Sequence, residues 1–570
     1  MTTYIDEQRT SILGGEVARR DFLGVPPPVL AAWTLAAVCA VGSFIIIGAG
    51  WWGVGTGAFI IIGTVAATLE LKGEKSWAAI KVHQLRTRLR RRAGHHVFVT
   101  PTDEAYGDDE LDPGWEIPVP LGKAWPLDLS GTGLDDMFII EHNNPGSGRF
   151  YTVVLALEGV SDGILGDADW ANRQLAFSTT LRGFAKRSSM IRRIGMLHRS
   201  VPADLTPHVR WADREINRVV NERRTQLEQL AALEDSTEAQ RADALRILAD
   251  EDALREQAVL ELPVASYADL LSVASVECEE HYSYATLVFP AMGELSDRAA
   301  RLARRKDASY IGGVAAVIRD ETIRAIDALR DAHLGSVTML GEQRACAVFR
   351  ALIDPSYKLD AHRGARWPSC FPSYIGGEES VLVSPRSDTP WHVRVGEIPP
   401  GSIAPTPLGP LWLSPLLTGV TPATGDSDTP PSPTIRTVSV VMDFVVEHVA
   451  RDAAKGDVTD DMARQHSEAK KERISDGSAE VMASSSMRRR MDLMPGSGHH
   501  GVIYTMWVSV AARSLDDLDA AETRMSEAAS NSAIGRITWQ TDDHDIAVFN
   551  TLPLGRGLAP NPKFTRRGLN

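Results

Sequence analysis

The chain has 570 residues and a formal net charge of −14, so it is too long for a single hydrophobic core and too acidic for bulk affinity to nucleic acid. Its four cysteines, Cys39, Cys278, Cys346 and Cys370, show no CxxC spacing, which argues against a disulfide framework and a four-thiolate zinc site. The composition predicts about two to four soluble domains in a reducing compartment, behind an apolar N-terminal region.

Residues 22–69 contain no Asp, Glu, Lys or Arg and are almost entirely apolar. A bilayer core of about 30 Å needs about 20 apolar helical residues, so this length accommodates two crossings. We predict a transmembrane hairpin over residues 22–71, with spans at 29–48 and 51–71. A signal peptide has only one short apolar region, and a buried hairpin of a soluble protein rarely runs this far without a charge.

Basic residues flank both ends of this region, which predicts that both termini and the bulk of the chain are cytoplasmic at the inner (plasma) membrane. Residues 1–21 are expected to form a cytoplasmic tail, and residues 72–94 a basic interfacial stalk helix. Gly53 and Gly57 have GxxxG spacing, which predicts close helix packing. The predicted membrane-interface residues are Arg19, Arg20, Trp51, Trp52, Lys72, Lys75, Trp77, Lys81, Arg86, Arg88, Arg90, Arg91 and Arg92.

Residues 95–387 predict an α/β region that contains a protruding helical arm at 207–262. The arm is charged along its length, and a solvated helical face explains those charges. Strands are expected at 116–120, 137–141, 150–157, 191–198 and 280–290, and helices at 167–190, 294–305, 309–334 and 340–352.

The segment 388–433 is rich in Pro, Gly, Ser and Thr, and we expect it to be a long connection with Trp391 and Trp412 as anchors. Residues 434–570 predict a C-terminal α+β domain, whose last helix is capped by Ser514. The order of strands at 434–446, 501–512 and 534–540 with the helices between them predicts a ferredoxin-like fold. The fold class expected overall is α/β (α+β), with mixed cytoplasmic domains behind a two-helix membrane hairpin.

No residue pattern in the sequence predicts a catalytic, cofactor or metal site. The GxxxxGK[ST], HExxH and GxSxG motifs do not occur. Neighbouring histidines on a strand point in different directions, so the pairs at 95–96 and 499–500 hardly share a metal. The helix dipole or a partner contact explains the basic run at 488–490 as well as nucleic acid would. The densest polar cluster is Asp542, Asp543, His544 and Asp545, where the turn-forming tendency of Asp is the simpler explanation.

The order of these elements resembles components of type IV secretion systems. The lead-in Arg19, Arg20, Phe22, Gly24 and Pro26, followed by the hairpin, resembles their small inner-membrane subunit. The soluble part resembles the N-terminal, non-motor half of their assembly ATPase, and proteins with this fused layout occur in actinobacterial conjugation clusters. The end of the C-terminal unit resembles the segment that leads into the motor domain, through Ala547, Phe549, Leu552, Pro553, Leu554 and Gly555.

This resemblance covers nearly the whole chain and consists of order and spacing. It implies a membrane-anchored structural subunit of a conjugative secretion machine, which forms an oligomeric assembly with other secretion-system membrane subunits. The chain stops at Asn570, where a motor domain would begin, so the resemblance implies a separate motor ATPase as partner.

Three alternatives remain open at this point. A type VII secretion membrane component has a similar layout of spans and cytoplasmic domain. A membrane-tethered enzyme would need the cluster at 542–545 to line a cleft with perturbed protonation. A DNA-guiding subunit would need a continuous basic groove, and the acidic net charge argues against nucleic acid as a direct stable ligand.

Overall fold

The computed structural model describes most of the chain. The ranges described are 27–48, 50–68, 77–94, 117–119, 121–134, 136–144, 148–159, 166–186, 188–233, 237–250, 279–306, 308–357, 365–371, 375–376, 381–383, 391–404, 408–409, 411–418, 434–445, 447–469, 478–495, 499–540 and 544–558, with a few isolated positions.

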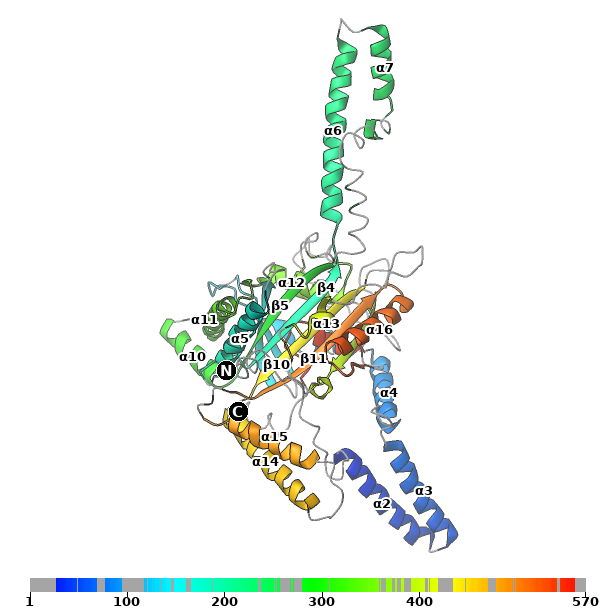
Figure 1. The fold of residues 1–570 in the computed structure, drawn as a ribbon, viewed down its shortest axis with the longest axis vertical. Coiled ribbons are helices and arrows are strands. Elements are labelled where there is room, and N and C mark those ends of the chain that lie inside the picture. Colours follow the sequence, from blue (N-terminus) through cyan, green and yellow to red (C-terminus); the bar gives the residue numbers. More distant parts are fainter. Residues whose placement is uncertain are drawn as a thin grey trace. The chain divides into compact units, whose positions relative to one another are not determined.

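The N-terminal region is a pair of packed helices, α2 (Pro27–Ile47) and α3 (Trp51–Thr68) (Figure 1). Trp33 Nε1 at the start of α2 donates a hydrogen bond of 2.8 Å to Thr68 Oγ1 at the end of α3, so the helices are antiparallel. A Cβ added at Gly57 would lie 3.4 Å from the Ala40 carbonyl oxygen, which places this glycine at the closest approach.

Among the described residues, α3 is the one helix long and apolar enough to cross a membrane. The apolar stretch Ala31–Ile46 of α2 is shorter than a full span. The predicted antiparallel helices are present, while the two-span membrane hairpin is not confirmed and stays a prediction. The stalk contains helix α4 (Trp77–Arg92), and the predicted tail at 1–21 lies outside the described residues.

The soluble part is a mixed α/β structure built on a large antiparallel sheet of 12 described strands. Its main path runs β1-β2-β3-β5-β4-β10-β11-β9-β8-β7, with β6 paired to β3 and β12 paired to β9. The strands are β1 (Ala124–Pro126), β2 (Ile140–Asn144), β3 (Gly148–Glu158), β4 (Arg193–Pro202), β5 (Glu279–Pro290), β6 (Ser336–Met339), β7 (Ile375–Gly376), β8 (Val381–Val383), β9 (Trp391–Ile398), β10 (Ile435–Phe444), β11 (Val502–Ala512) and β12 (Thr538–Trp539).

The same strand order occurs twice in this sheet. We call β6-β3-β5-β4 the first half-sheet and β12-β9-β11-β10 the second half-sheet. In chain order, each half has its first strand in the middle, with its third strand on one side and its fourth on the other. The registers match this description, because Leu155 pairs with Ala285 and Met339 in the first half, and Glu397 pairs with Trp507 and Thr538 in the second.

The half-sheets meet where β4 lies beside β10, and both strands run through the middle of the sheet (Figure 1). Phe444 N, at the end of β10, donates to Arg192 O, just before β4, at 2.9 Å. The side chains of Arg193 and Asp443 form an ion pair of 3.1 Å at the same place.

Helices cover one face of each half-sheet and bury its alternate apolar residues. Over the first half, α5 (Asp167–Ala185), α10 (Glu294–Lys306) and α11 (Tyr310–Asp331) pack on a core that contains Phe289. Over the second half, α13 (Ser414–Thr418) and α16 (Leu515–Asn531) pack on a core that includes Val508, Val510 and Leu518. The remaining short helices are α12 (Glu342–Ile353), η3 (Trp367–Cys370), η4 (Pro400–Ser402), α17 (His544–Ala547) and η5 (Val548–Thr551).

Each half-sheet carries a helical insertion between its second and third strands. The first insertion is the predicted arm, with α6 (Thr206–Ala232) and α7 (Glu238–Leu248), and it belongs to a separate compact unit formed by residues 199–282 and 421–436. Thr237 and Gln240 form a capping box that starts α7. The second insertion consists of α14 (Glu447–Ala469) and α15 (Ser478–Asp492), which pack together (Figure 1).

The last described segment, residues 544–558, joins the two half-sheets, and we call it the strap. His544 Nδ1 accepts a hydrogen bond of 3.1 Å from Val395 N on β9, and Gly555 O accepts one of 2.8 Å from Arg193 on β4. Gly555 has φ +63° and Gly557 has φ +100°, a left-handed backbone that L side chains rarely adopt. A Cβ at Gly555 would lie 2.5 Å from Val288 Cγ2 on β5, and one at Gly557 would lie 2.4 Å from Trp507 Nε1 on β11. The strap therefore depends on glycine where it meets each half-sheet.

The structure differs from the sequence prediction mainly in the segment 388–433. We expected a connection there, but Trp391–Ile398 is β9, the central strand of the second half-sheet. The prediction missed this strand because its flanks are rich in proline and no predicted helix lies next to it. No strand forms at the described residues 117–119, and the strand expected at 534–540 is reduced to Thr538–Trp539. Proline at 118 and at 120 removes backbone donors, which explains the first difference.

Candidate functional site

The helix pair α2–α3 has its large apolar side chains on the outside. Trp51 and Trp52 are 92% and 83% exposed, and Ile46 is 86% exposed. In a water-soluble helix pair the apolar face is turned inward, because burial removes it from water. Further exposed side chains on the pair are Leu35, Val38, Val41, Phe44, Ile45, Val54, Phe59, Ile61 and Ile62.

The hydroxyl groups of this pair are satisfied inside the helices. Thr56 Oγ1 donates to Trp52 O, Thr64 Oγ1 to Ile60 O and Ser43 Oγ to Ala40 O, each at 2.8 Å. A polar group without a hydrogen bond in hydrocarbon costs several kcal/mol, and the hydrogen bonds within these helices avoid that cost. The surface of the pair is therefore chemically suited to lipid.

The predicted membrane-interface residues that the structure describes lie on α3 and α4. Trp51 and Trp52 are exposed on α3, and Lys81, Arg88 and Arg92 are exposed on α4. The two glycines of the GxxxG pattern, at 53 and 57, are both buried. Trp77, Arg86, Arg90 and Arg91 lie within α4, but their side chains are outside the described part of the structure, as are Arg19, Arg20, Lys72 and Lys75 as whole residues.

Helix α4 exposes an apolar stripe next to its basic residues. Val82, Leu85 and Leu89 are spaced i, i+3 and i+7, and each is more than half exposed. Lys81 Nζ donates to Gln84 Oε1 at 3.1 Å and remains at the surface. An apolar stripe bordered by Lys and Arg is typical of a helix that lies in a membrane interface.

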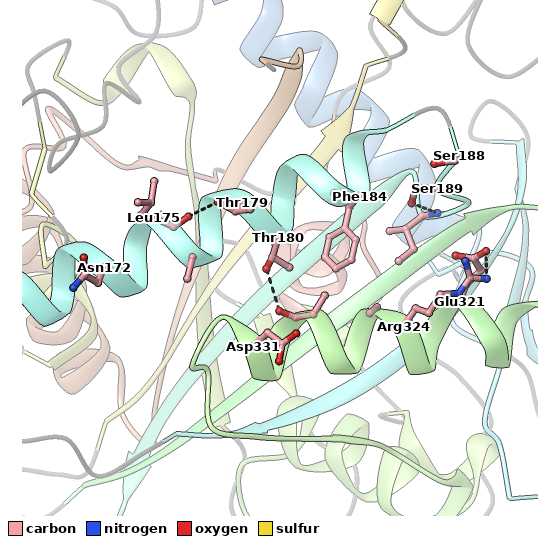
Figure 2. Close-up of a pocket in the computed structure, with 15 residues that line it drawn as sticks. Asn172, Leu175, Thr179, Thr180, Phe184, Ser188, Ser189, Glu321, Arg324 and Asp331 are labelled. Atoms are coloured by element: carbon pink, nitrogen blue, oxygen red, sulfur yellow. Dashed lines mark hydrogen bonds and ion pairs between the residues drawn. The ribbon is translucent and has the colours of Figure 1, made fainter. Parts of the chain in front are cut away.

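The first half-sheet has a groove of about 670 Å³ between α5 and α11 (Figure 2). Its walls carry small residues, among them Ala176 and Gly183 on α5 and Ala328 on α11. Figure 2 shows the hydrogen bond from Thr180 Oγ1 to the Ala328 carbonyl oxygen, 3.0 Å long, which ties the two helices at the groove. Phe184 is buried beneath it.

Several polar groups of the groove form contacts within the protein. The buried Glu321 carboxylate receives Arg324 at 2.7 Å and Arg298 at 3.3 Å. Ser189 Oγ accepts from Ile191 N at 3.2 Å, and Thr179 Oγ1 donates to Leu175 O at 2.9 Å. These contacts leave the groove with a surface of small side chains between the two helices.

Of the cluster at 542–545, the structure describes His544 and Asp545. Asp542 and Asp543 lie outside the described residues. His544 is buried with its Nδ1 bonded to a β9 amide, so it positions the strap. No group of three or more His, Cys, Asp or Glu side chains able to hold a metal occurs among the described residues. The pair His95 and His96 is not described, and His499 is exposed.

A buried polar contact fixes the far end of the strap. Arg556 Nη2 donates to His142 Nδ1 on β2 at 3.0 Å, and the His142 ring stacks on Phe150 with 4.4 Å between centroids. Burial, together with Arg556 and Arg193, holds the pKa of His142 well below its ordinary 6.5. Burial also lowers the pKa of Arg556 to about 10.

No protein-family model matches the chain, and no curated protein matches it in sequence.

The groove and the strap were missed by reasoning from the sequence alone. The groove is lined by residues that lie about 150 positions apart, since Thr180 and Ala328 differ by 148. Its only local sign is a run of small residues on α5, at 176, 180 and 183, which occupy one side of a helix. The strap was noted only through a resemblance, and its glycines were the physical sign.

Proposed function

We propose that this protein is a membrane-anchored structural subunit of a conjugative, type IV-like secretion system, which provides a cytoplasmic platform for a separate motor ATPase. It is held in the inner membrane by α2 and α3, with both termini cytoplasmic. It works in an oligomeric assembly with other membrane subunits of the system.

The observation that carries the anchor is the outward-facing apolar surface of α2 and α3. Side chains such as Trp51, Phe59 and Ile62 are exposed, while the hydroxyls of the pair are bonded within it. Exposed apolar area of this extent on a helix pair favours a membrane or a partner over water. The exposed basic residues of α4 support a cytoplasmic position for the domain that follows.

The doubled strand order supports the platform. Each half-sheet has the order fourth, first, third and second strand, with helices on one face, and we interpret both as ferredoxin-like units. The helical insertions between the second and third strands enlarge the surface without interrupting the sheet. The charges of the arm pair along one helix, as in Arg218 with Glu215 and Glu222. Such pairing is typical of a solvent-exposed helix, which fits the arm as an outer part of the platform.

The groove between α5 and α11 supports docking as the role of the first half-sheet. Its buried Glu321 carboxylate is paired and the Thr179 and Thr180 hydroxyls bond to backbone, so we interpret the groove as a site for shape-based docking. A groove walled by small residues lets a partner approach the backbone closely.

Membrane anchoring is tested by extraction of the full chain from membranes with alkaline carbonate. We expect the protein to stay in the membrane fraction, and the double variant Leu35→Arg with Phe59→Arg to be released, because charges at a bilayer centre cost several kcal/mol. Thr523→Arg on the exposed side of α16 is the control and should stay membrane-bound. Release of the unaltered protein would refute the anchor.

The platform is tested by purifying the detergent-solubilised protein from its native host and identifying the co-purifying proteins. We expect a P-loop ATPase together with other secretion subunits. An ATPase with three motor domains would assign the protein to a type VII system instead. Recovery of the folded protein alone would contradict the platform.

A further inference from the structure

The helix pair α14–α15 has an unusual distribution of side chains. Its inner seam contains Asp457, Asp461 and Ser486, which are all buried, and Arg489, which is half-buried. Ser486 Oγ donates to Asp461 Oδ2, and Arg489 Nη1 forms an ion pair of 3.1 Å with Asp457. Polar groups thus occupy the position where a soluble helix pair usually places its large apolar residues.

Large apolar side chains at the C-terminal end of α15 are exposed. Met487 and Met491 are 49% and 70% exposed, and their spacing of i, i+4 puts them on one side of the helix. Met494, which is 54% exposed, lies in the turn just after the helix. We call the three methionines the methionine face. The seam takes mainly small residues such as Ala479 and Ala483 instead. Three exposed methionines at the end of one helix mark a surface that another apolar phase covers.

Two cations border the methionine face. Arg488 and Arg490 are exposed, and neither forms an ion pair with any residue that the structure describes. Exposed cations beside an apolar stripe fit a partner that is both apolar and anionic. Helix α4 shows the same combination, with Val82, Leu85 and Leu89 bordering its exposed basic residues.

We propose that the methionine face of α15 lies on the anionic surface of the membrane, with Met487, Met491 and Met494 in the acyl boundary and Arg488 and Arg490 at the headgroups. This inference rests on the proposed membrane anchor, which brings the chain to a bilayer. The unbranched, flexible methionine side chain adapts to an irregular surface, and arginine reaches the headgroup level while its stem stays apolar.

The test uses the full chain in lipid nanodiscs, with a polarity-sensitive dye on Met491→Cys in a background where Cys39 and Cys278 are replaced by alanine. Phospholipids brominated in their acyl chains quench a dye that reaches the acyl boundary. One set of discs contains phosphatidylcholine alone and the other contains phosphatidylglycerol as well. The matched control carries the dye on Thr523→Cys, at an exposed position of α16.

We expect strong quenching at position 491 in anionic discs, weak quenching in neutral discs, and none at position 523 in either. Arg488→Gln with Arg490→Gln should remove the difference between the two discs, as should high salt. These two positions are exposed, so the variant keeps the seam intact.

Absence of quenching at position 491 in anionic discs that contain the protein would overturn the inference while leaving the anchor intact. Equal quenching in both kinds of disc would overturn the role of the arginines. Protection of the dye only after the motor ATPase is added would assign the methionine face to a protein partner. A chain that does not enter discs at all would refute the anchor and this inference together.

Discussion

The two half-sheets share a strand order but differ in the helices that cover them. In the first, the helix after the first strand is α5, which has 19 residues; in the second it is α13, which has 5. The long α5 runs beside α11 and leaves the groove open between them. The short α13 is pinned instead, because Leu416 N donates to Ser532 Oγ at 3.2 Å in a buried contact.

This difference separates the part of the molecule that sets the fold from the part that offers surface. The central strands β3 and β9 each pair on both sides, so changing either would disturb a whole half-sheet. The first helix is free to vary in length, because it packs on one face only. We infer that partner contacts of this protein reside in the helices and insertions, where the halves differ most.

The largest expected effect tests whether the half-sheets fold as one unit. Phe289→Ala empties a fully buried site in the first core, and Leu518→Ala does so in the second. We expect losses of about 4 and about 3 kcal/mol, because a truncated core side chain leaves a cavity. Since β4 and β10 are neighbours in one sheet, hydrogen exchange should rise in peptides of both halves in each variant.

Exchange that rises only in the altered half would show that the half-sheets unfold independently. The exposed substitution Thr523→Ala controls for the labelling and should change neither half.

The next effect breaks the junction itself. Arg193 holds Asp443 on β10 at 3.1 Å and the Gly555 carbonyl oxygen of the strap at 2.8 Å. Arg193→Ala should cost about 2 kcal/mol in the free energy of unfolding, because it removes charge-assisted hydrogen bonds from a partly buried site. Asp443→Asn keeps a hydrogen-bond acceptor and should cost less. Denaturant unfolding measures both, and equal costs would mean that the strap bond contributes nothing.

A smaller effect concerns pH, through His142 at the far end of the strap. Its pKa in the folded protein is depressed, so the unfolded chain takes up the proton first as the pH falls below 6.5. Stability is therefore lost on acidification, by at most about 1.4 kcal/mol per pH unit from this group. Thermal unfolding between about pH 7.5 and about pH 5.5 measures the loss.

His142→Gln should flatten this part of the pH profile while it still offers an acceptor to Arg556. His448→Gln on α14 is exposed and serves as the control. An unchanged profile in His142→Gln would assign the acid sensitivity to other groups.

The elements that the sequence predicted well are those with long periodic patterns. The strand expected at 280–290 is β5 at 279–290, and the capped helix after Ser514 begins at Leu515, where Ser514 Oγ accepts from Asp517 N. These elements carry their own hydrophobic period and their own cap, so local chemistry decides them. The mixed α/β class follows from the same patterns, whereas the single large antiparallel sheet was not predicted.

What the sequence did not predict depends on contacts between distant segments. Strand β9 is surrounded by proline and glycine, and its identity as a central strand comes from pairing with β11 and β12, which lie more than 100 residues later. The doubled strand order was hidden for this reason, because without β9 the second half lacks its first strand. The groove depends on how α5 and α11 settle on the sheet, which no local pattern encodes.

The smallest expected effect concerns the helix cap that the two half-sheets share. The helix before the last strand, α11 in the first half and α16 in the second, begins with a serine cap. Ser309 Oγ accepts from Gly312 N at 3.0 Å, and Ser514 Oγ accepts from Asp517 N at 3.1 Å. Ser309→Ala and Ser514→Ala should each cost about 1 kcal/mol, seen as faster exchange in the first turn of the affected helix.

Aspartate at the same two positions should change the stability of the two helices in opposite directions. The first turn of α11 holds no acidic residue, so Ser309→Asp keeps the cap and adds a favourable charge at the positive end of the helix. The first turn of α16 already holds Asp516 and Asp517, so Ser514→Asp adds a third carboxylate that is repelled by the other two. We expect Ser309→Asp to match or exceed the stability of the unaltered protein and Ser514→Asp to fall below it, by a few tenths of a kcal/mol in each direction. Equal behaviour of the two variants would mean that the first-turn charges do not matter, and that the two helix starts are equivalent despite their different sequences.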